Sequence, residues 1–216
     1  MGTMTRNLSL KRFDWVVQGS PVGPDPICDV PVLTTSDALV VPTIGAIVPD
    51  WLLVVPRTCT LSLAGATAEV RRSVLDLAEA VSLRVGRPEK TVYFEHGPAT
   101  SGSTVGCGVD QAHLHVLNTE FNVLEMALAD DSVDWSLTDG GDPWARLAGT
   151  EYYFIQSNGR AYMGSPRVPQ SQYFRKHIAC AAGVPWQWDY KLWPNYENVR
   201  RTYERFCGLE AAVKSA

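Results

Sequence analysis

The segment at residues 66–86, ATAEVRRSVLDLAEAVSLRVG, constrains the fold more than any other stretch of the chain. Its apolar residues recur at intervals of three and four, which places them on one face of an α-helix: Val70, Val74, Leu77 and Val81. Gly86, with Pro88 two residues later, predicts where this helix ends. The preceding stretch at 30–55 contains β-branched runs broken by turn signals, which predict antiparallel strands. A long helix between strand segments indicates an α+β protein rather than a doubly wound one.

Local patterns predict the remaining elements. Further strands are expected at 91–96, 111–117, 151–157 and 160–163, with Gly159 in a hairpin turn. Further helices are expected at 121–129, 170–182 and 195–206, whereas the polar stretch 131–149 is typical of a loop. Pro and Gly are frequent at 19–26, so residues 1–28 are expected to form an N-terminal arm and 29–216 a single domain that ends in helices.

The composition excludes several classes of protein. Hydrophobic residues make up 45% and charged residues 19%, as in ordinary globular domains. The net charge of −4 gives no general reason to bind nucleic acid or an anionic membrane. The five cysteines are scattered without a C-x-x-C pair, and neither a signal-peptide core nor a long apolar stretch is present. We therefore expect a soluble cytoplasmic protein.

Two of the four histidines lie in the stretch CGVDQAHLH at 107–115. Alternate residues of a strand face the same side, so Gln111, His113 and His115 are expected to form a polar ladder. One imidazole of such a row can act as a nucleophile or base while its neighbour binds a substrate oxygen. The rings could instead be ordinary core residues. They could also bind zinc, with a third ligand from His96, Asp110, Glu95 or Cys107, although no spacing requires a metal.

At this point the sequence resembles the histidine triad superfamily, whose motif is three histidines alternating with apolar residues after a glycine-bearing loop. The resemblance is carried by VYFEHGPATSGSTVGCGVDQAHLHVL and by the upstream PTIGAIVPDWLLVVPRTCTLSLAGAT, and it spans roughly residues 30–120. It implies an antiparallel sheet backed by the helix at 66–86. It also implies nucleotidyl chemistry on a phosphoanhydride or phosphoramidate.

The resemblance assigns roles to individual residues. The middle histidine of the motif falls on His113, which would attack the α-phosphorus to give a nucleotidyl-histidine. The third falls on His115, which would bind the phosphoryl oxygens as charge develops. The backbone N–H groups of Gly106, Cys107 and Gly108 would cradle the same phosphate.

Two positions depart from the family pattern. Gln111 stands where the first histidine is expected, and it can donate and accept hydrogen bonds but cannot become a cation. Glu95 stands where many members have an asparagine, and a carboxylate there repels phosphate unless it is protonated or paired. Glu95 and the adjacent His96 are nevertheless assigned to substrate or phosphate binding.

A second basic segment lies near the C-terminus. In SQYFRKHIA at 171–179, Gln172, Arg175 and Lys176 lie within about one turn near the start of an expected helix, where they could bind a phosphate or carboxylate. The alternative is a solvated helix face. A similar SQ-x-FR segment, followed by a stretch like WQWDYKLWPNYENVRRT, is typical of bacterial histidine-triad-like proteins. Its tryptophans are interpreted as packing residues rather than base-stacking ones.

The sequence therefore predicts a nucleotide hydrolase or nucleotidyltransferase that uses His113 covalently and needs no cofactor. The alternatives are a repurposed enzyme with different chemistry and a nucleotide-binding module without turnover. The expected partner is a small phosphorylated molecule, and a homodimer is an expectation from the resemblance alone.

Overall fold

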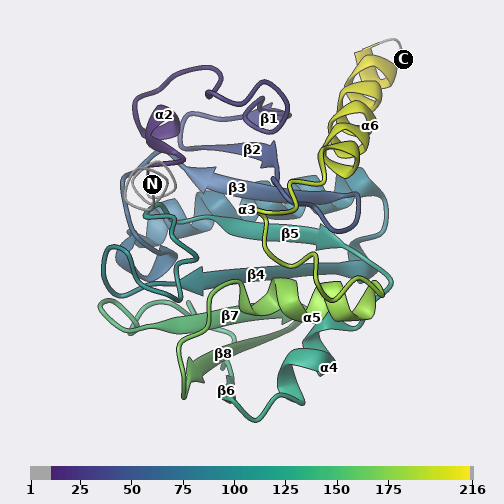
Figure 1. Cartoon of the computed structure of the whole chain (residues 1–216). Coiled ribbons are helices and arrows are strands. Elements are labelled where there is room, and N and C mark those ends of the chain that lie inside the picture. Colours follow the sequence, from purple (N-terminus) through teal and green to yellow (C-terminus); the bar gives the residue numbers. More distant parts are fainter. Residues whose placement is uncertain (1–10, 215–216) are drawn as a thin grey trace, which may run out of the picture.

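A computed structural model describes residues 11–214, with side chains through Cys207 (Figure 1). Its helices are α2 (Asp14–Val17), α3 (Ala68–Val85), α4 (Val123–Leu128), α5 (Tyr173–Ala181), α6 (Tyr196–Lys214) and the short η1 (Leu63–Gly65) and η2 (Pro88–Lys90). Its strands are β1 (Leu33–Thr34), β2 (Ala38–Pro42), β3 (Trp51–Pro56), β4 (Thr91–Gly97), β5 (Leu114–Asn118), β6 (Val133–Leu137), β7 (Tyr152–Ser157) and β8 (Arg160–Pro166). None of the described helices is long and apolar enough to cross a membrane.

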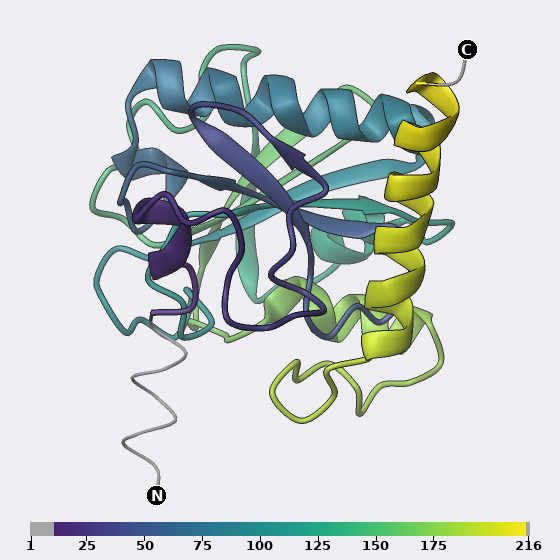
Figure 2. The same ribbon diagram turned by 90° about the horizontal axis from the view of Figure 1, so that it is seen from above.

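The eight strands form one antiparallel sheet in the order β1-β2-β3-β5-β4-β7-β8-β6. Helices cover both faces, with α3 on one side and α5 on the other, while α6 runs along one end (Figure 2). This arrangement confirms the α+β prediction and the expectation that the long helix packs on the sheet. The central strands β5 and β4 are the ones that carry His115 and His96, so the histidines lie in the middle of the sheet.

Helix α3 forms as its periodicity predicts. The Thr67 side chain caps its first turn by accepting the Val70 N–H, and Gly86 ends it with a φ of +82°. Val74, Leu77 and Val81 are buried against β2, β3 and β5. Arg71 of the same helix is buried as well. Its guanidinium donates to Asp142 and to the carbonyl of Ala66, so it ties the helix to the loop before β7.

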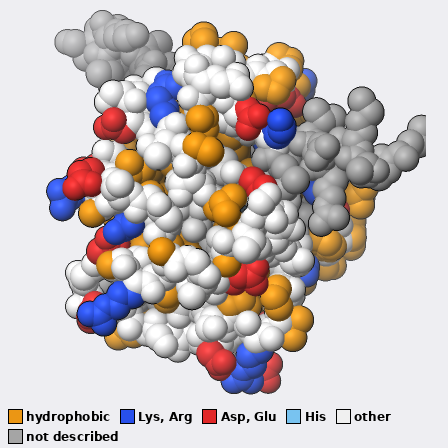
Figure 3. Space-filling model, turned by 90° about the vertical axis from the view of Figure 1, so that its left-hand side faces the viewer, with side chains coloured by type: hydrophobic (Ala, Val, Ile, Leu, Met, Phe, Trp, Pro, Cys, Tyr) orange, Lys and Arg blue, Asp and Glu red, His pale blue; other side chains and the backbone are white. Residues whose placement is uncertain are grey.

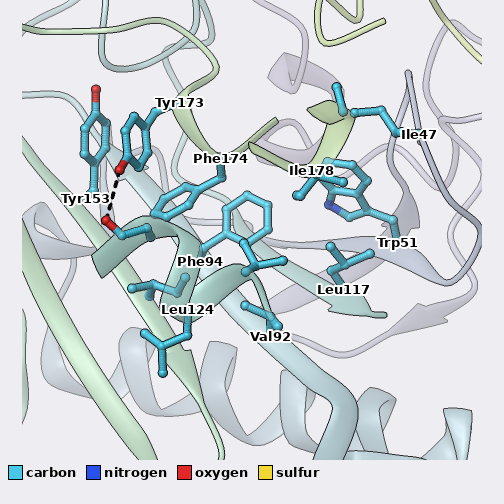
Figure 4. Close-up of a cluster of buried hydrophobic side chains, with 14 of the residues drawn as sticks. Ile47, Trp51, Val92, Phe94, Leu117, Leu124, Tyr153, Tyr173, Phe174 and Ile178 are labelled. Carbon is cyan, nitrogen blue, oxygen red and sulfur yellow. Dashed lines mark hydrogen bonds between the residues drawn. The ribbon is translucent and has the colours of Figure 1, made fainter. Parts of the chain in front are cut away.

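An aromatic cluster fills the space between α5 and the sheet, on the face that lies away from α3 (Figure 4). Phe174 of α5 packs on Phe94 of β4, with ring centroids 4.7 Å apart. Tyr173 stacks on Tyr153 of β7 at 4.6 Å, and its hydroxyl donates to the carbonyl of Ala127 at the end of α4. These contacts fix α5 over β4 and β7.

The prediction that residues 131–149 form a loop was wrong in part, because this stretch contains β6. This strand pairs with β8 at the sheet edge. Its propensity is weak, and its hydrogen bonds come from pairing with a strand more than twenty residues later in the chain. The hairpin between β7 and β8 is confirmed. Asn158 and Gly159 have φ values of +50° and +72°, which a two-residue turn of this kind requires.

Part of the expected N-terminal arm packs on the sheet. Phe13, Trp15 and Val16 are buried against Leu53 of β3 and its neighbours. Residues 1–10 of the arm lie outside the described residues. On the molecular face shown in Figure 3, acidic and basic side chains lie side by side, so this face carries no uniform charge.

Candidate functional site

The predicted histidines border a cavity on the α5 side of the sheet. The cavity has a volume of about 40 Å³, which is room for roughly three water molecules. Its walls come from the N-terminal segment, the loop between β2 and β3, strands β3, β4 and β5, the loop before β5, the start of α5 and the loop after α5. The residues that matter for its chemistry are Arg12, His96, His113, His115, Arg175 and Tyr190. A space of this size holds a phosphate-sized group but not a whole nucleotide.

His113 lies just before β5, which begins at Leu114 rather than at residue 111 as expected. Its Nδ1 lies 2.8 Å from the backbone carbonyl of Gln111. A carbonyl only accepts, so the proton of the neutral ring is on Nδ1 and Nε2 carries a free lone pair. Burial, ahead of the repulsion by Arg12, lowers the pKa of His113. The ring is therefore neutral at physiological pH, with Nε2 as its nucleophilic atom.

His115 has the opposite tautomer. Its Nδ1 accepts a hydrogen bond from Nε1 of Trp51 at 3.0 Å, and its ring stacks on Phe94 at 4.4 Å. An indole N–H only donates, so the proton of the neutral His115 must be on Nε2. Burial, with the nearby His113, His96 and Arg175, lowers the pKa of His115 well below its usual value. The two rings, with centroids 5.1 Å apart, thus combine one free lone pair with one N–H donor.

His96 adds a third imidazole from β4. Its ring lies edge-on to His115 at 5.9 Å and to Phe174 at 5.1 Å. Its Nε2 is buried and has no hydrogen-bond partner among the described residues. Burial lowers the pKa of His96 to about 3, so this ring is neutral as well. The three imidazoles therefore contribute no positive charge to the cavity.

Arg175 supplies the positive charge. Its Nε donates to the carbonyl of Trp188 at 2.9 Å, its Nη2 donates to that of Gly45, and its guanidinium lies 4.7 Å over the Trp51 ring. Burial lowers the pKa of Arg175 to about 10, which still leaves it charged at neutral pH. No carboxylate forms an ion pair with it within the described part of the chain. A buried cation without a counter-ion is expected to attract an anionic ligand.

The glycine-bearing loop reaches the cavity through Cys107, whose φ is +58°. The Cys107 N–H donates to the carbonyl of Thr104, so this N–H is not available to a phosphate. Its thiol accepts the N–H of Gln172 at 3.0 Å, and burial raises the pKa of that thiol to about 11. Gln172 also borders the cavity, and its side chain holds the following loop through Asp189 and Tyr190. Gly106 and Gly108 flank Cys107 but do not border the cavity.

Two other predicted site residues lie outside the cavity. Lys176 points away, because its ammonium contacts Gln170 and lies 5.2 Å over the Trp188 ring. The Gln111 side chain donates at 2.9 Å to each of the carbonyls of Pro56 and Thr58, at the end of β3. Gln111 therefore joins the site through its backbone carbonyl, which orients His113, and its amide anchors the start of β5.

Glu95 points to the α3 face, because neighbouring residues of a strand face opposite sides. Its carboxylate accepts three hydrogen bonds, from the Leu63 N–H at 2.7 Å, Trp144 Nε1 at 2.9 Å and the Tyr152 hydroxyl at 2.7 Å. It is 1% exposed, and no cation pairs with it in the structure as described. The structure therefore places Glu95 beneath the cavity floor as a structural anchor for the sheet, away from any phosphate bound on the other face.

The Glu95 environment predicts a pH-dependent stability. Burial, only partly opposed by the three donors, raises the pKa of Glu95 to about 7. The folded state then holds this proton more tightly than the unfolded state, so its contribution is lost as the pH rises from about 4.5 to about 7. We expect the free energy of unfolding to fall by about 3 kcal/mol over that range through this carboxyl group.

Urea unfolding at several pH values tests this prediction. The contribution of Glu95 is the difference in the free energy of unfolding between wild type and Glu95→Gln, followed as a function of pH. Parallel pH profiles for the two proteins would contradict the prediction. The buried histidines have lowered pKa values, so their contribution has the opposite sign and is common to both proteins.

No metal site accompanies these residues. Among the side chains that the structure describes, which run from residue 11 to residue 207, no three histidine, cysteine, aspartate or glutamate residues are grouped so that they could hold a metal ion. Arg12 and Tyr190 border the cavity although the sequence did not indicate them. The pattern at Arg12 is merely a basic residue followed by an aromatic one, and nothing local to residues 11–17 connects it with residues 107–115.

No protein-family model matches the sequence, and no curated protein is similar enough to match. A solved structure of a Hit-like protein involved in cell-cycle regulation, from Bartonella henselae, matches with 20% sequence identity. The match covers 51% of this chain and 76% of that one, with a TM-score of 0.39. A likeness at that level supports no transfer of function.

Proposed function

We propose that this protein is a nucleotide hydrolase or nucleotidyltransferase of the histidine triad type, in which His113 carries the nucleotidyl group. The observation that carries the proposal is the opposite hydrogen bonding of the two Nδ1 atoms, which face the Gln111 carbonyl in His113 and the Trp51 N–H in His115, beside the cation of Arg175. This arrangement combines a neutral nitrogen nucleophile, an N–H donor and a positive charge in a cavity of phosphate size.

The chemistry follows from these atoms. The Nε2 lone pair of His113 attacks the α-phosphorus, a P–N bond forms, and the bond from phosphorus to the leaving group breaks with its electron pair. The ring becomes a substituted imidazolium, whose proton stays on Nδ1 and is donated in a hydrogen bond to the Gln111 carbonyl. His115 donates through Nε2 to a phosphoryl oxygen, and Arg175 offsets the charge that develops there. Attack by water or another acceptor then releases the nucleotide and restores the neutral imidazole.

Intact-protein mass spectrometry after a brief acid quench tests the proposal. The protein is mixed with nucleoside 5′-phosphoanhydrides, phosphoramidates and nucleotide sugars, beside the His113→Ala variant. We expect an adduct with the mass of a nucleoside monophosphate on the wild type alone, and its mass would identify the base. A folded wild type that forms no adduct and turns over none of these compounds would contradict the proposal, and it would favour a binding module or different chemistry.

A further inference from the structure

A second residue that borders the cavity carries a buried polar atom without a partner in the part of the chain that the structure describes. Besides Nε2 of His96, the Nε of Arg12 is buried without a hydrogen bond among the described residues. Arg12 and His96 both border the same small cavity. Buried donors in native proteins almost always have partners, so an exception needs an explanation. The guanidinium Nε always carries a proton, and a ligand that satisfies it must offer an acceptor atom.

The rest of the Arg12 side chain is held firmly. Its Nη2 donates to Oδ1 of Asp29 at 2.6 Å and lies 3.3 Å from the Cys28 thiol. The next residue, Phe13, packs against the His113 ring with centroids 5.7 Å apart. Asp29 is fully buried, and its other oxygen accepts the Asp25 N–H. One end of the guanidinium is therefore anchored next to His113, while its Nε edge remains unused.

Arg12 and Arg175 act on different parts of the histidine row. The charge of Arg12 contributes to the lowered pKa of His113, whereas the charge of Arg175 contributes to the lowered pKa values of His96 and His115. The cavity between them accommodates only a small group. A tetrahedral phosphoryl group fits this space, because its oxygens point in several directions and can accept hydrogen bonds from more than one donor.

We propose that Arg12 is a substrate-binding residue contributed by the N-terminal segment, and that its Nε donates to a phosphoryl oxygen held between Arg12 and Arg175. The proposal rests on the proposed function of the same cavity. It extends that function by making the segment around residues 11–17 part of the site. The segment then limits substrates to those whose phosphoryl group keeps a free anionic oxygen toward the N-terminal side.

A calorimetric titration of the full-length protein with inorganic phosphate tests this role of Arg12, because it measures binding and needs no turnover. Arg12→Met is expected to weaken phosphate binding by about 10- to 100-fold, as for the loss of a charge-assisted hydrogen bond. Arg12→Lys keeps the charge but has no N–H at the Nε position, so it should remain at least about 10-fold weaker than wild type. Lys11→Ala, a change at the adjacent exposed residue, should bind as wild type does.

Asp29→Asn separates binding from structure. It breaks the ion pair but leaves the Arg12 Nε–H, so it should bind phosphate at least as tightly as wild type. The proposal would be overturned if Asp29→Asn and Arg12→Met lost phosphate affinity equally, or if either Arg12 variant bound phosphate with wild-type affinity. It would also be overturned if the wild type bound no phosphate at millimolar concentrations. A missing nucleotidyl adduct with Arg12-dependent phosphate binding intact would instead reject the covalent chemistry and support the Arg12 site.

Discussion

Replacing His113 with alanine is expected to lower turnover by about 1,000-fold or more, because the variant lacks the atom that would form the P–N bond. Binding of a nucleoside monophosphate should change little, since Arg175 and His115 remain in place. The loss of stability should be small, because His113 is only partly buried. Steady-state kinetics and calorimetry on the same preparation separate the two effects.

A His113→Gly variant makes this prediction sharper. It leaves a space beside the Gln111 carbonyl, where added imidazole can take the place of the side chain. Rescue of turnover by imidazole would indicate a nucleophile or base at this position. His177→Ala is the matched control, because His177 lies on the outside of α5 beside Asp130 and does not border the cavity. Turnover by His113→Ala at the wild-type rate would refute the covalent mechanism.

The second large effect is expected from Arg175→Met, which keeps much of the apolar stem but removes the unpaired cation. Phosphate affinity and kcat/KM should each fall by about 100-fold, as when a donor to a developing oxyanion is lost. The carbonyls of Gly45 and Trp188 lose their donor, which destabilises the fold, but removal of a desolvated charge offsets part of that cost.

Calorimetry with phosphate, combined with thermal unfolding, distinguishes anion binding from folding. Arg175→Lys keeps a charge and should recover part of the affinity without the planar contact to Trp51. Lys176→Met is the control, since the adjacent lysine points away from the cavity. If Arg175→Met bound phosphate as wild type does, Arg175 would be a purely structural residue.

Local signals predicted most of the fold. The periodicity and caps of α3, the strand at β4 and the turn at Gly159 are properties of short segments, and each formed near its predicted residues. β6 was missed because its structure depends on β8 rather than on its own residues. β5 begins three residues later than predicted, at Leu114 rather than at residue 111. The Gln111 side chain donates to carbonyls at the end of β3, and this residue does not continue the strand.

The site was predictable where a short sequence pattern marked its residues, as at His113, His115 and Arg175. The spacing of His113 and His115 was sufficient to place both at one cavity. Glu95 and His96 could not be separated in advance, because alternation puts them on opposite faces but does not tell which face holds the cavity. Arg12 lies about one hundred residues before His113, and only the folded chain brings them together.

The composition of the cavity wall also has a consequence for folding. Its residues run from Arg12 to Tyr190, and the strands beneath it pair out of sequence order, as β3-β5-β4-β7. Contacts between distant parts of a chain form late and slowly. A nascent or partly unfolded chain would thus carry its histidines without the neighbours that set their tautomers. The arrangement that the proposed chemistry needs would then be complete only at the end of folding.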